Sequence, residues 1–72
     1  MIQVIHVEPL GQGWAVRHGP ASPPQVFASG AKAEDAALSL GARLAEAGRA
    51  SEIRIYLRGG ALGGRYVYPA GM

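Results

Sequence analysis

Hydrophobic and polar positions follow two different periods along the chain, and together they predict strands on both sides of one helix. From Ala31 to Gly48, apolar residues recur three and four positions apart, which is typical of an amphipathic helix. The apolar stripe consists of Ala33, Ala36, Ala37, Leu40, Leu44 and Ala47. One helix cannot bury such a stripe alone, so we expect the flanking segments to supply a second layer.

Three residues mark details of this helix. Ser29 is the expected N-cap, because its hydroxyl can accept a hydrogen bond from an amide of the first turn. Gly48 is expected to end the helix in a left-handed conformation. Gly41 lies in mid-helix at a cost of about 1 kcal/mol relative to alanine, which indicates a close approach to a strand.

The segments on either side of the helix resemble strands. Ile2–Glu8 and Trp14–His18 predict a hairpin with a glycine-rich turn, and a loop is expected at residues 19–24. Gln25–Ala28 is short and extended, and either pairs at a sheet edge or leads into the helix. Glu52–Arg58 alternates cleanly, and Arg65–Tyr68 follows it after the loop GGALGG.

These elements predict a single α+β domain over residues 1–72, in the order ββαββ. We expect an antiparallel sheet of about four strands with one amphipathic helix packed on one face. The inward residues are expected to be one face of the first strand together with Trp14, Val16, Phe27, Ala36, Leu40, Leu44, Ile53, Ile55, Leu57 and Val67.

Short motifs along this pattern are similar to those of a bacterial family of small proteins, domain-of-unknown-function family 2188. They are Gly13-Trp14-Ala15-Val16, Gly19, Phe27, the alanines Ala36 and Ala45, and Glu52-Ile53-Arg54-Ile55 running into Gly59-Gly60. The chain departs from the family pattern at Tyr56, where a histidine is common, and at Gly59-Gly60, where Asp-Gly is common. The resemblance covers most of the chain from about Gly13 onward and implies a fold but no activity.

Composition narrows the class of protein. The 72 residues are 49% hydrophobic and 17% charged, which is typical of a globular domain, and they include no cysteine. No apolar run approaches the roughly 20 residues that span a bilayer, and the first residues lack the features of a secretory signal. We therefore expect a cytoplasmic protein. Alanine supplies much of the apolar content, so we expect a thin core and a homodimer.

Arginine and tyrosine side chains are expected to gather on the outward face of the sheet. The candidate residues of a nucleic-acid or partner face are Arg17, Arg54, Tyr56, Arg58, Tyr66 and Tyr68. Aromatic rings can stack on bases while arginines bind phosphates, so this face could bind nucleic acid. The net charge is only +2, and a solvated sheet surface explains the same residues. Our leading interpretation is a small interaction module that acts through this face and its own dimer, with nucleic-acid binding as the alternative.

Other chemistry finds less support in the sequence. His6 and Glu8 share a strand face that His18 could approach as a third metal ligand, but two unrelated surface histidines explain the pattern better. GGALGG lacks the Lys-Ser/Thr pair of a phosphate-binding loop. No nucleophile is placed beside a base. We therefore predict no catalytic residues, no cofactor, no metal site and no small-molecule substrate.

Overall fold

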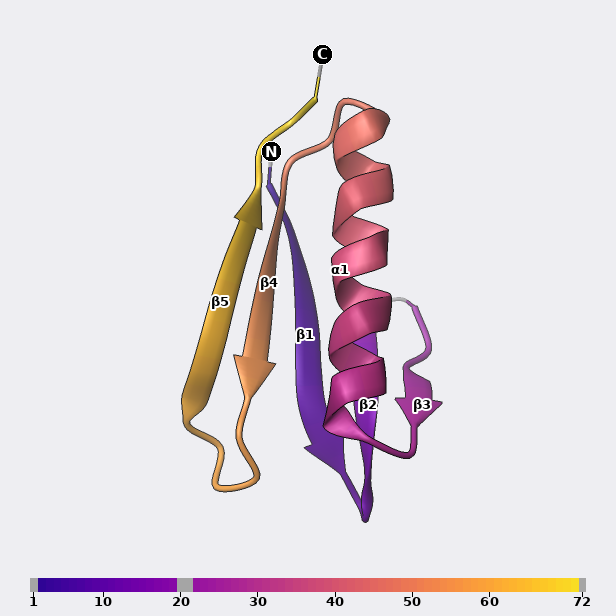
Figure 1. Cartoon of the computed structure of the whole chain (residues 1–72), viewed down its shortest axis with the longest axis vertical. Coiled ribbons are helices and arrows are strands. Elements are labelled where there is room, and N and C mark those ends of the chain that lie inside the picture. The colour runs from indigo at the N-terminus through magenta and orange to yellow at the C-terminus, as the bar shows by residue number, and fades with distance from the viewer. Residues whose placement is uncertain (1, 20–21, 72) are drawn as a thin grey trace.

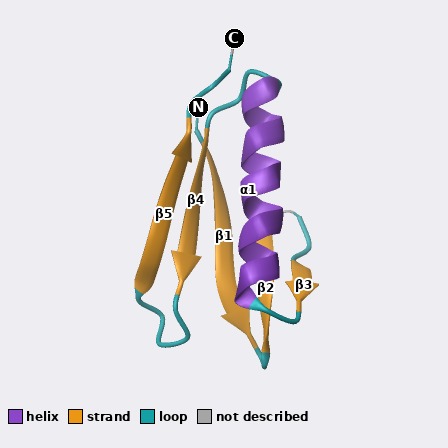
Figure 2. Ribbon diagram, in the orientation of Figure 1, coloured by secondary structure: helices purple, strands orange, loops and turns teal. Residues whose placement is uncertain are grey.

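One helix packs on one face of a five-stranded sheet in this protein (Figures 1 and 2). The structure, a computed structural model, describes residues 2–19 and 22–71, so positions 20 and 21 of the predicted loop lie outside the described residues. The elements are β1 (Gln3–Leu10), β2 (Gly13–His18), β3 (Gln25–Phe27), α1 (Gly30–Glu46), β4 (Ser51–Tyr56) and β5 (Leu62–Tyr68). The predicted α+β class is confirmed.

The sheet is mixed, which corrects the expected antiparallel sheet of about four strands. Its order is β3-β2-β1-β4-β5, and the central pair β1–β4 is parallel, whereas the other three pairs are antiparallel. The short strand β3 causes the difference. It adds one reversal of chain direction before α1, so that β4 enters the sheet running the same way as β1 (Figure 1).

The features predicted for the helix are confirmed. Ser29 is its N-cap, and its hydroxyl accepts a hydrogen bond from the amide of Lys32 at 3.2 Å. Gly48 follows the helix with a φ of 80°. Gly41 is buried against the sheet, where an added Cβ would lie 2.9 Å from Cδ1 of Tyr68 and 3.0 Å from Cδ1 of Ile53.

The core between α1 and the sheet is thin. Its fully buried cluster is Ile5, Val7, Val16, Ala33, Ala37 and Ile53. Partly buried Trp14, Phe27, Ala36, Leu38, Leu40, Leu44, Ile55 and Tyr68 pack around this cluster. Two predicted core residues are wrong, because Leu57 is 53% exposed and Val67 is 50% exposed. Leu57 lies beyond the end of β4, and Val67 lies on the face of the sheet that the helix does not cover.

The pairing register assigns the side chains to the two faces of the sheet, since paired residues share a face. Ile5, Ile53 and Tyr66 are paired across β1, β4 and β5, and they face α1. The opposite side, here called the open face, is covered by no element of the described chain. Its residues are Val4, His6, Glu8, Ala15, Arg17, Val26, Glu52, Arg54, Tyr56, Arg65 and Val67.

Candidate functional site: the open face of the sheet

Four nitrogen-bearing side chains lie side by side across the middle of the open face. His6 of β1 is paired with Arg17 of β2 on one side and with Arg54 of β4 on the other, and Arg54 is paired with Arg65 of β5. We call Arg17, His6, Arg54 and Arg65 the basic row. Neighbouring strands are about 4.8 Å apart, so the row runs across four strands with one side chain on each.

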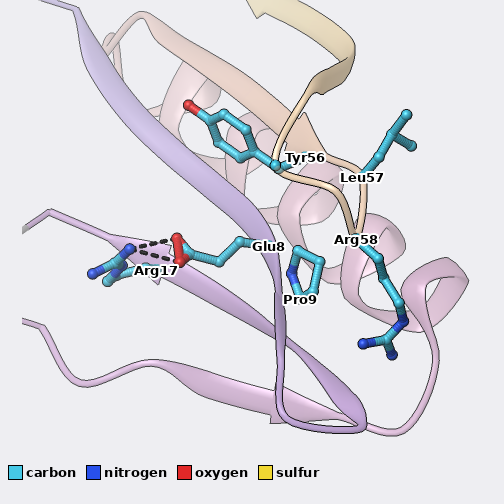
Figure 3. Close-up of a pocket in the computed structure, with 7 residues that line it drawn as sticks. Glu8, Pro9, Arg17, Tyr56, Leu57 and Arg58 are labelled. Carbon is cyan, nitrogen blue, oxygen red and sulfur yellow. Dashed lines mark hydrogen bonds and ion pairs between the residues drawn. The ribbon is translucent and has the colours of Figure 1, made fainter.

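Glutamates on either side of the basic row pair with its arginines. Glu8 lies two residues along β1 from His6, and both of its carboxylate oxygens accept from Nη2 of Arg17, one of them at 2.7 Å (Figure 3). Glu52 lies on the other side of the row. Its carboxylate accepts from Nε of Arg54 at 2.6 Å and pairs with Nε of Arg65 at 3.0 Å.

The ion pairs at Glu52 change its protonation chemistry. The residue is only 7% exposed, because its neighbours on the sheet surround it. Hydrogen bonds from Arg65, which has the larger effect, and from Arg54 lower the pKa of the Glu52 carboxyl to about 2. Burial alone would raise this pKa. The same contacts raise the pKa of Arg54 and of Arg65. All three groups are therefore charged near neutral pH, and one carboxylate holds two guanidinium groups together.

An aromatic pair and two shallow hollows complete the surface. The rings of His6 and Tyr56 stack with their centroids 5.8 Å apart and an angle of 17° between their planes. One hollow of about 410 Å³ is lined by Glu8, Pro9, Arg17, Tyr56, Leu57, Arg58 and Gly60 (Figure 3). A second hollow of about 390 Å³ is lined by Val4, His6, Arg17 and Gly19. Arg17 lines both hollows, so the two lie next to each other.

Three of the six predicted face residues lie on the open face, namely Arg17, Arg54 and Tyr56. Arg58 does not join them, because β4 ends at Tyr56 and the chain turns. Its guanidinium donates to the carbonyl oxygens of Gly11 at 3.0 Å and Gln12 at 2.9 Å, and it lies 5.2 Å from the centroid of the Trp14 ring. Figure 3 shows this side chain pointing away from Arg17 and Glu8.

Tyr66 and Tyr68 lie on the side of the sheet that packs on α1, so their assignment to the outward face is wrong. The hydroxyl of Tyr66 donates to Glu34 of the helix at 3.2 Å, and the Tyr68 ring packs against the core near Gly41. The two remaining residues that alternate with them, Arg65 and Val67, occupy the open face. The prediction assigned Val67 to the core and thereby reversed the two faces of β5.

Sequence reasoning missed Arg65, Glu52 and His6 as members of the central surface. The strict alternation of β4 already placed Glu52 with Arg54 and Tyr56, and that signal could have included it. Arg65 and His6 depend on cross-strand register, because only the pairing of β1, β4 and β5 brings them beside Arg54. A single sequence contains no direct signal for that pairing.

The two histidines lie on opposite faces of the sheet. His6 is on the open face with Glu8, whereas His18 is paired with Ile5 on the side of the helix and hydrogen-bonds through Nε2 to Oε1 of Gln3. Residues 2–19 and 22–71 contain no group of three His, Asp or Glu side chains arranged to hold a metal ion. Within the same residues, α1 is too short and too polar to cross a membrane.

Comparisons with known proteins identify no relative of this chain. No family model, no curated protein and no solved structure gives a significant match.

Proposed function

We propose that this chain is a small interaction module that self-associates, with the open face of one copy packed on the open face of a second. The observation that carries the proposal is the parallel pair β1–β4 at the centre of a sheet that the described chain covers on one side only. In all-parallel sheets both faces are almost always covered, because the connections place helices over them. In this mixed sheet the one crossover between β1 and β4 places α1 over one face and leaves the other face of the central pair exposed. A second copy would supply the missing cover.

Apolar side chains on the open face support a protein partner. Val26 at one side of the face is 64% exposed, and Val67 near the other side is 50% exposed. Val4 lies between them on the central strand β1 and is half-buried. Burying such residues contributes free energy in proportion to the apolar area that is removed from water.

The charges of the open face do not prevent two copies from approaching. Among the described residues of this face, Arg17, Arg54 and Arg65 are balanced in part by Glu8 and Glu52, and each carboxylate is already paired. The side chains of the central strands span roughly 20 Å in each direction, from the usual strand spacing and rise. A face of that size would bury roughly 800 Å² in total over the two copies, below the roughly 1,200 Å² at which stable interfaces begin, so we expect a weak dimer that dissociates on dilution.

Sedimentation velocity over a range of concentrations tests this proposal. Val4 is paired with Glu52, so Val4→Lys places an ammonium group beside a carboxylate, and we expect the single chain to tolerate it. Between two packed faces, however, the same ammonium group would lose its contact with water, which is unfavourable. We expect this variant to show a lower average mass than the wild type. Ala42→Lys adds the same charge at an exposed position of α1 and is the control. Equal masses for wild type and Val4→Lys would refute the face contact.

A second candidate function is binding of single-stranded nucleic acid, and the basic row favours it. Three arginines and His6 lie across four adjacent strands, with Tyr56 stacked on His6 beside them. Sheet surfaces that bind single strands combine cationic and aromatic side chains in this way. The paired glutamates weaken the case, since a phosphate would have to displace Glu8 from Arg17 or compete with Glu52.

Oligonucleotide titrations separate this candidate from self-association. Arg17→Gln removes a charge from the basic row, whereas Arg58→Gln removes one from the loop after β4 and is the matched control. If nucleic acid binds along the row, Arg17→Gln should bind oligonucleotides more weakly than the wild type, and Arg58→Gln should not. The affinity of Arg17→Gln should also depend less steeply on salt concentration, because one phosphate contact is lost. Equal affinities for the two variants would exclude the row as the binding site.

We also propose a cellular location and a non-enzymatic role for this chain. A cytoplasmic location is proposed because a sequence without cysteine fits a reducing compartment. A non-enzymatic role follows from the lack of a nucleophile beside a base in the sequence. The similarity of Gly13-Trp14-Ala15-Val16 and its neighbouring motifs to family 2188 stays a prediction of the sequence.

A further inference from the structure

The two edges of the sheet differ in how well they are protected against pairing with another strand. β3 at one edge has only three residues and follows Pro23-Pro24, and short strands and prolines both discourage strand addition. β5 at the other edge has seven residues, Leu62–Tyr68, with no proline among them. No strand in residues 2–19 or 22–71 pairs with the outer side of β5. This edge is therefore the one open to a further strand.

The hydrogen-bond pattern identifies the backbone groups that β5 presents outward. The amide of Gln3 in β1 donates to the carbonyl of Ala50, so Ala50, Glu52 and Arg54 direct their backbone groups toward β1. The intervening residues of β4 then point toward β5, and Ile53 pairs with Tyr66. Because successive residues alternate in direction, Arg65 and Val67 direct their N–H and C=O groups away from the sheet.

The side chains along this edge do little to repel another strand. Leu62 is 52% exposed, Tyr66 is 42% exposed and Val67 is 50% exposed. Arg65 is the one charged residue of β5, and its guanidinium is drawn back over the open face by Glu52. Edge strands are usually protected by lysine, proline, inward charges or bulges. In β5 the irregular pairing opposite Ile55 and Tyr56 lies at one end and Pro69 follows the other end, whereas residues 65–68 contain none of these features.

We propose that β5 pairs antiparallel with β5 of a second copy, so that two sheets join into one of ten strands. The second copy presents the same unpaired backbone edge, and a two-fold axis satisfies both edges at once. This contact goes beyond the proposed function, because it uses the edge of the sheet rather than the open face. The two contacts can exist separately or in one assembly of four chains.

Charge and hydrogen bonding select the register of this pairing. Outward-directed residues must oppose one another, and of the registers that keep all of residues 64–68 paired within β5, one places Arg65 opposite Arg65 and the other places Arg65 opposite Val67 of the second copy. The first register places like charges directly opposite, which is unfavourable. The second places Tyr66 on the two-fold axis, opposite Tyr66 of the second copy, with an Arg65–Val67 pair on each side. In that register the tyrosines form a non-hydrogen-bonded pair, the type in which side chains approach most closely.

Disulfide trapping tests the predicted register directly. The chain contains no cysteine, so a single Tyr66→Cys substitution can form a disulfide only with another copy. Cβ atoms of directly opposed strand residues lie about 4.5–5.5 Å apart, close to the separation in a disulfide. We expect Tyr66→Cys to give a covalent dimer rapidly under mild oxidation. Ala42→Cys, at an exposed position of α1, is the control for random collision. Cross-linking of Tyr66→Cys no faster than that of Ala42→Cys would overturn the proposal.

A proline at Val67 tests the backbone contact. Proline removes the outward N–H of residue 67 and leaves intact the amides of Tyr66 and Tyr68 that face β4. Val67→Ala also replaces the valine side chain but keeps the N–H, so it is the control. We expect sedimentation to show less association for Val67→Pro than for Val67→Ala, and circular dichroism to show both folded. Equal association of the two variants would contradict pairing through β5.

The outcome of the cross-linking test at residue 66 is independent of the test of the face contact. Val4→Lys changes the centre of the open face and leaves the edge backbone unchanged, so it should retain the Tyr66→Cys cross-link when the two substitutions are combined. A lower average mass for Val4→Lys in sedimentation, without a specific cross-link at residue 66, would support the face contact and refute the edge contact. A specific cross-link at residue 66, with the same average mass for Val4→Lys and the wild type, would support the edge contact and refute the face contact.

Discussion

Glu52 of β4 and Arg65 of β5 form an ion pair across neighbouring strands on the exposed side of the sheet, with Nε of Arg65 3.0 Å from Oε2 of Glu52. Arg54 donates to the same oxygen at 2.6 Å, so a single carboxylate bridges two guanidinium groups that are paired side by side in the sheet. This contact holds the β4–β5 end of the basic row together. It also links the protonation state of Glu52 to the stability of the fold.

The first prediction concerns acid. The pKa of Glu52 falls from an ordinary 4.5 to about 2 in the folded chain, so the folded state binds this proton less tightly than the unfolded state. The resulting stabilisation is complete above pH 4.5 and is lost as the pH falls toward about 2. Glu52→Gln should therefore lower the midpoint of thermal unfolding by several degrees near neutral pH and much less near pH 2.

Circular dichroism melts of Glu52→Gln and of Glu46→Gln, a control at the exposed end of α1, measure this difference. A loss of stability that is the same at both pH values would contradict the assignment of a lowered pKa to Glu52.

The second prediction concerns the close contact between the helix and the sheet. Alanine at position 41 would favour the helix by about 1 kcal/mol in isolation. Its Cβ would lie 2.9 Å from Tyr68 and 3.0 Å from Ile53, and overpacking of this kind costs about 1–3 kcal/mol. We expect Gly41→Ala to be destabilising overall in urea denaturation. Ser39→Ala, at an exposed position of the same helix, should be neutral or stabilising. A more stable Gly41→Ala would show that the helix does not approach β4 and β5 this closely.

The third prediction concerns Arg58 and Trp14. The guanidinium of Arg58 lies 5.2 Å from the centroid of the Trp14 ring and donates to the carbonyls of the β1–β2 turn. Arg58→Gln should change the fluorescence of Trp14, the only tryptophan in the chain, while the circular dichroism spectrum is preserved. Arg49→Gln, beyond the far end of α1, is the control. An unchanged emission spectrum in Arg58→Gln would place its side chain away from the indole ring.

The fourth prediction concerns the start of the helix. Ser29 accepts a hydrogen bond from the amide of Lys32, and loss of such an N-cap costs about 1 kcal/mol. Ser29→Ala should lower the free energy of unfolding by that amount, and Ser29→Asp should restore it. Ser22→Ala, at an exposed loop position, should have little effect. Identical stabilities for Ser29→Ala and Ser22→Ala would contradict the role of Ser29 as the cap.

Local signals in the sequence predicted the helix and the two hairpins well. The spacing of Ala33, Ala37 and Leu40 and the cap at Ser29 depend on nearby residues only, and the structure confirms both. Gly41 was predicted to approach a strand from its helix-propensity cost alone, and it does. The helix and its cap could be predicted because the physics that determines them acts within one or two helical turns, and the contact at Gly41 because a glycine that weakens the helix locally indicates a close neighbour.

Non-local relationships could not be predicted in the same way. The sequence leaves open whether the segment of β3 pairs at a sheet edge or leads into the helix, and that one reversal decides whether β4 runs parallel or antiparallel to β1. The faces of β5 were reversed because Val67 was assumed to be buried, whereas Tyr66 and Tyr68 fill the space beside α1. A tyrosine can pack its ring in a core and keep its hydroxyl at the surface, so alternation of valine with tyrosine does not say which side is buried.

The claim that the open face is the interaction surface is tested most directly by a dilution series of amide NMR spectra of the wild-type protein. Self-association through this face predicts shifts that change with protein concentration at Val4, His6, Arg54 and Tyr56, with further changes at Tyr66 if β5 pairs as well. Spectra that do not change on dilution from millimolar concentration, or changes confined to the solvent side of α1, would contradict the account.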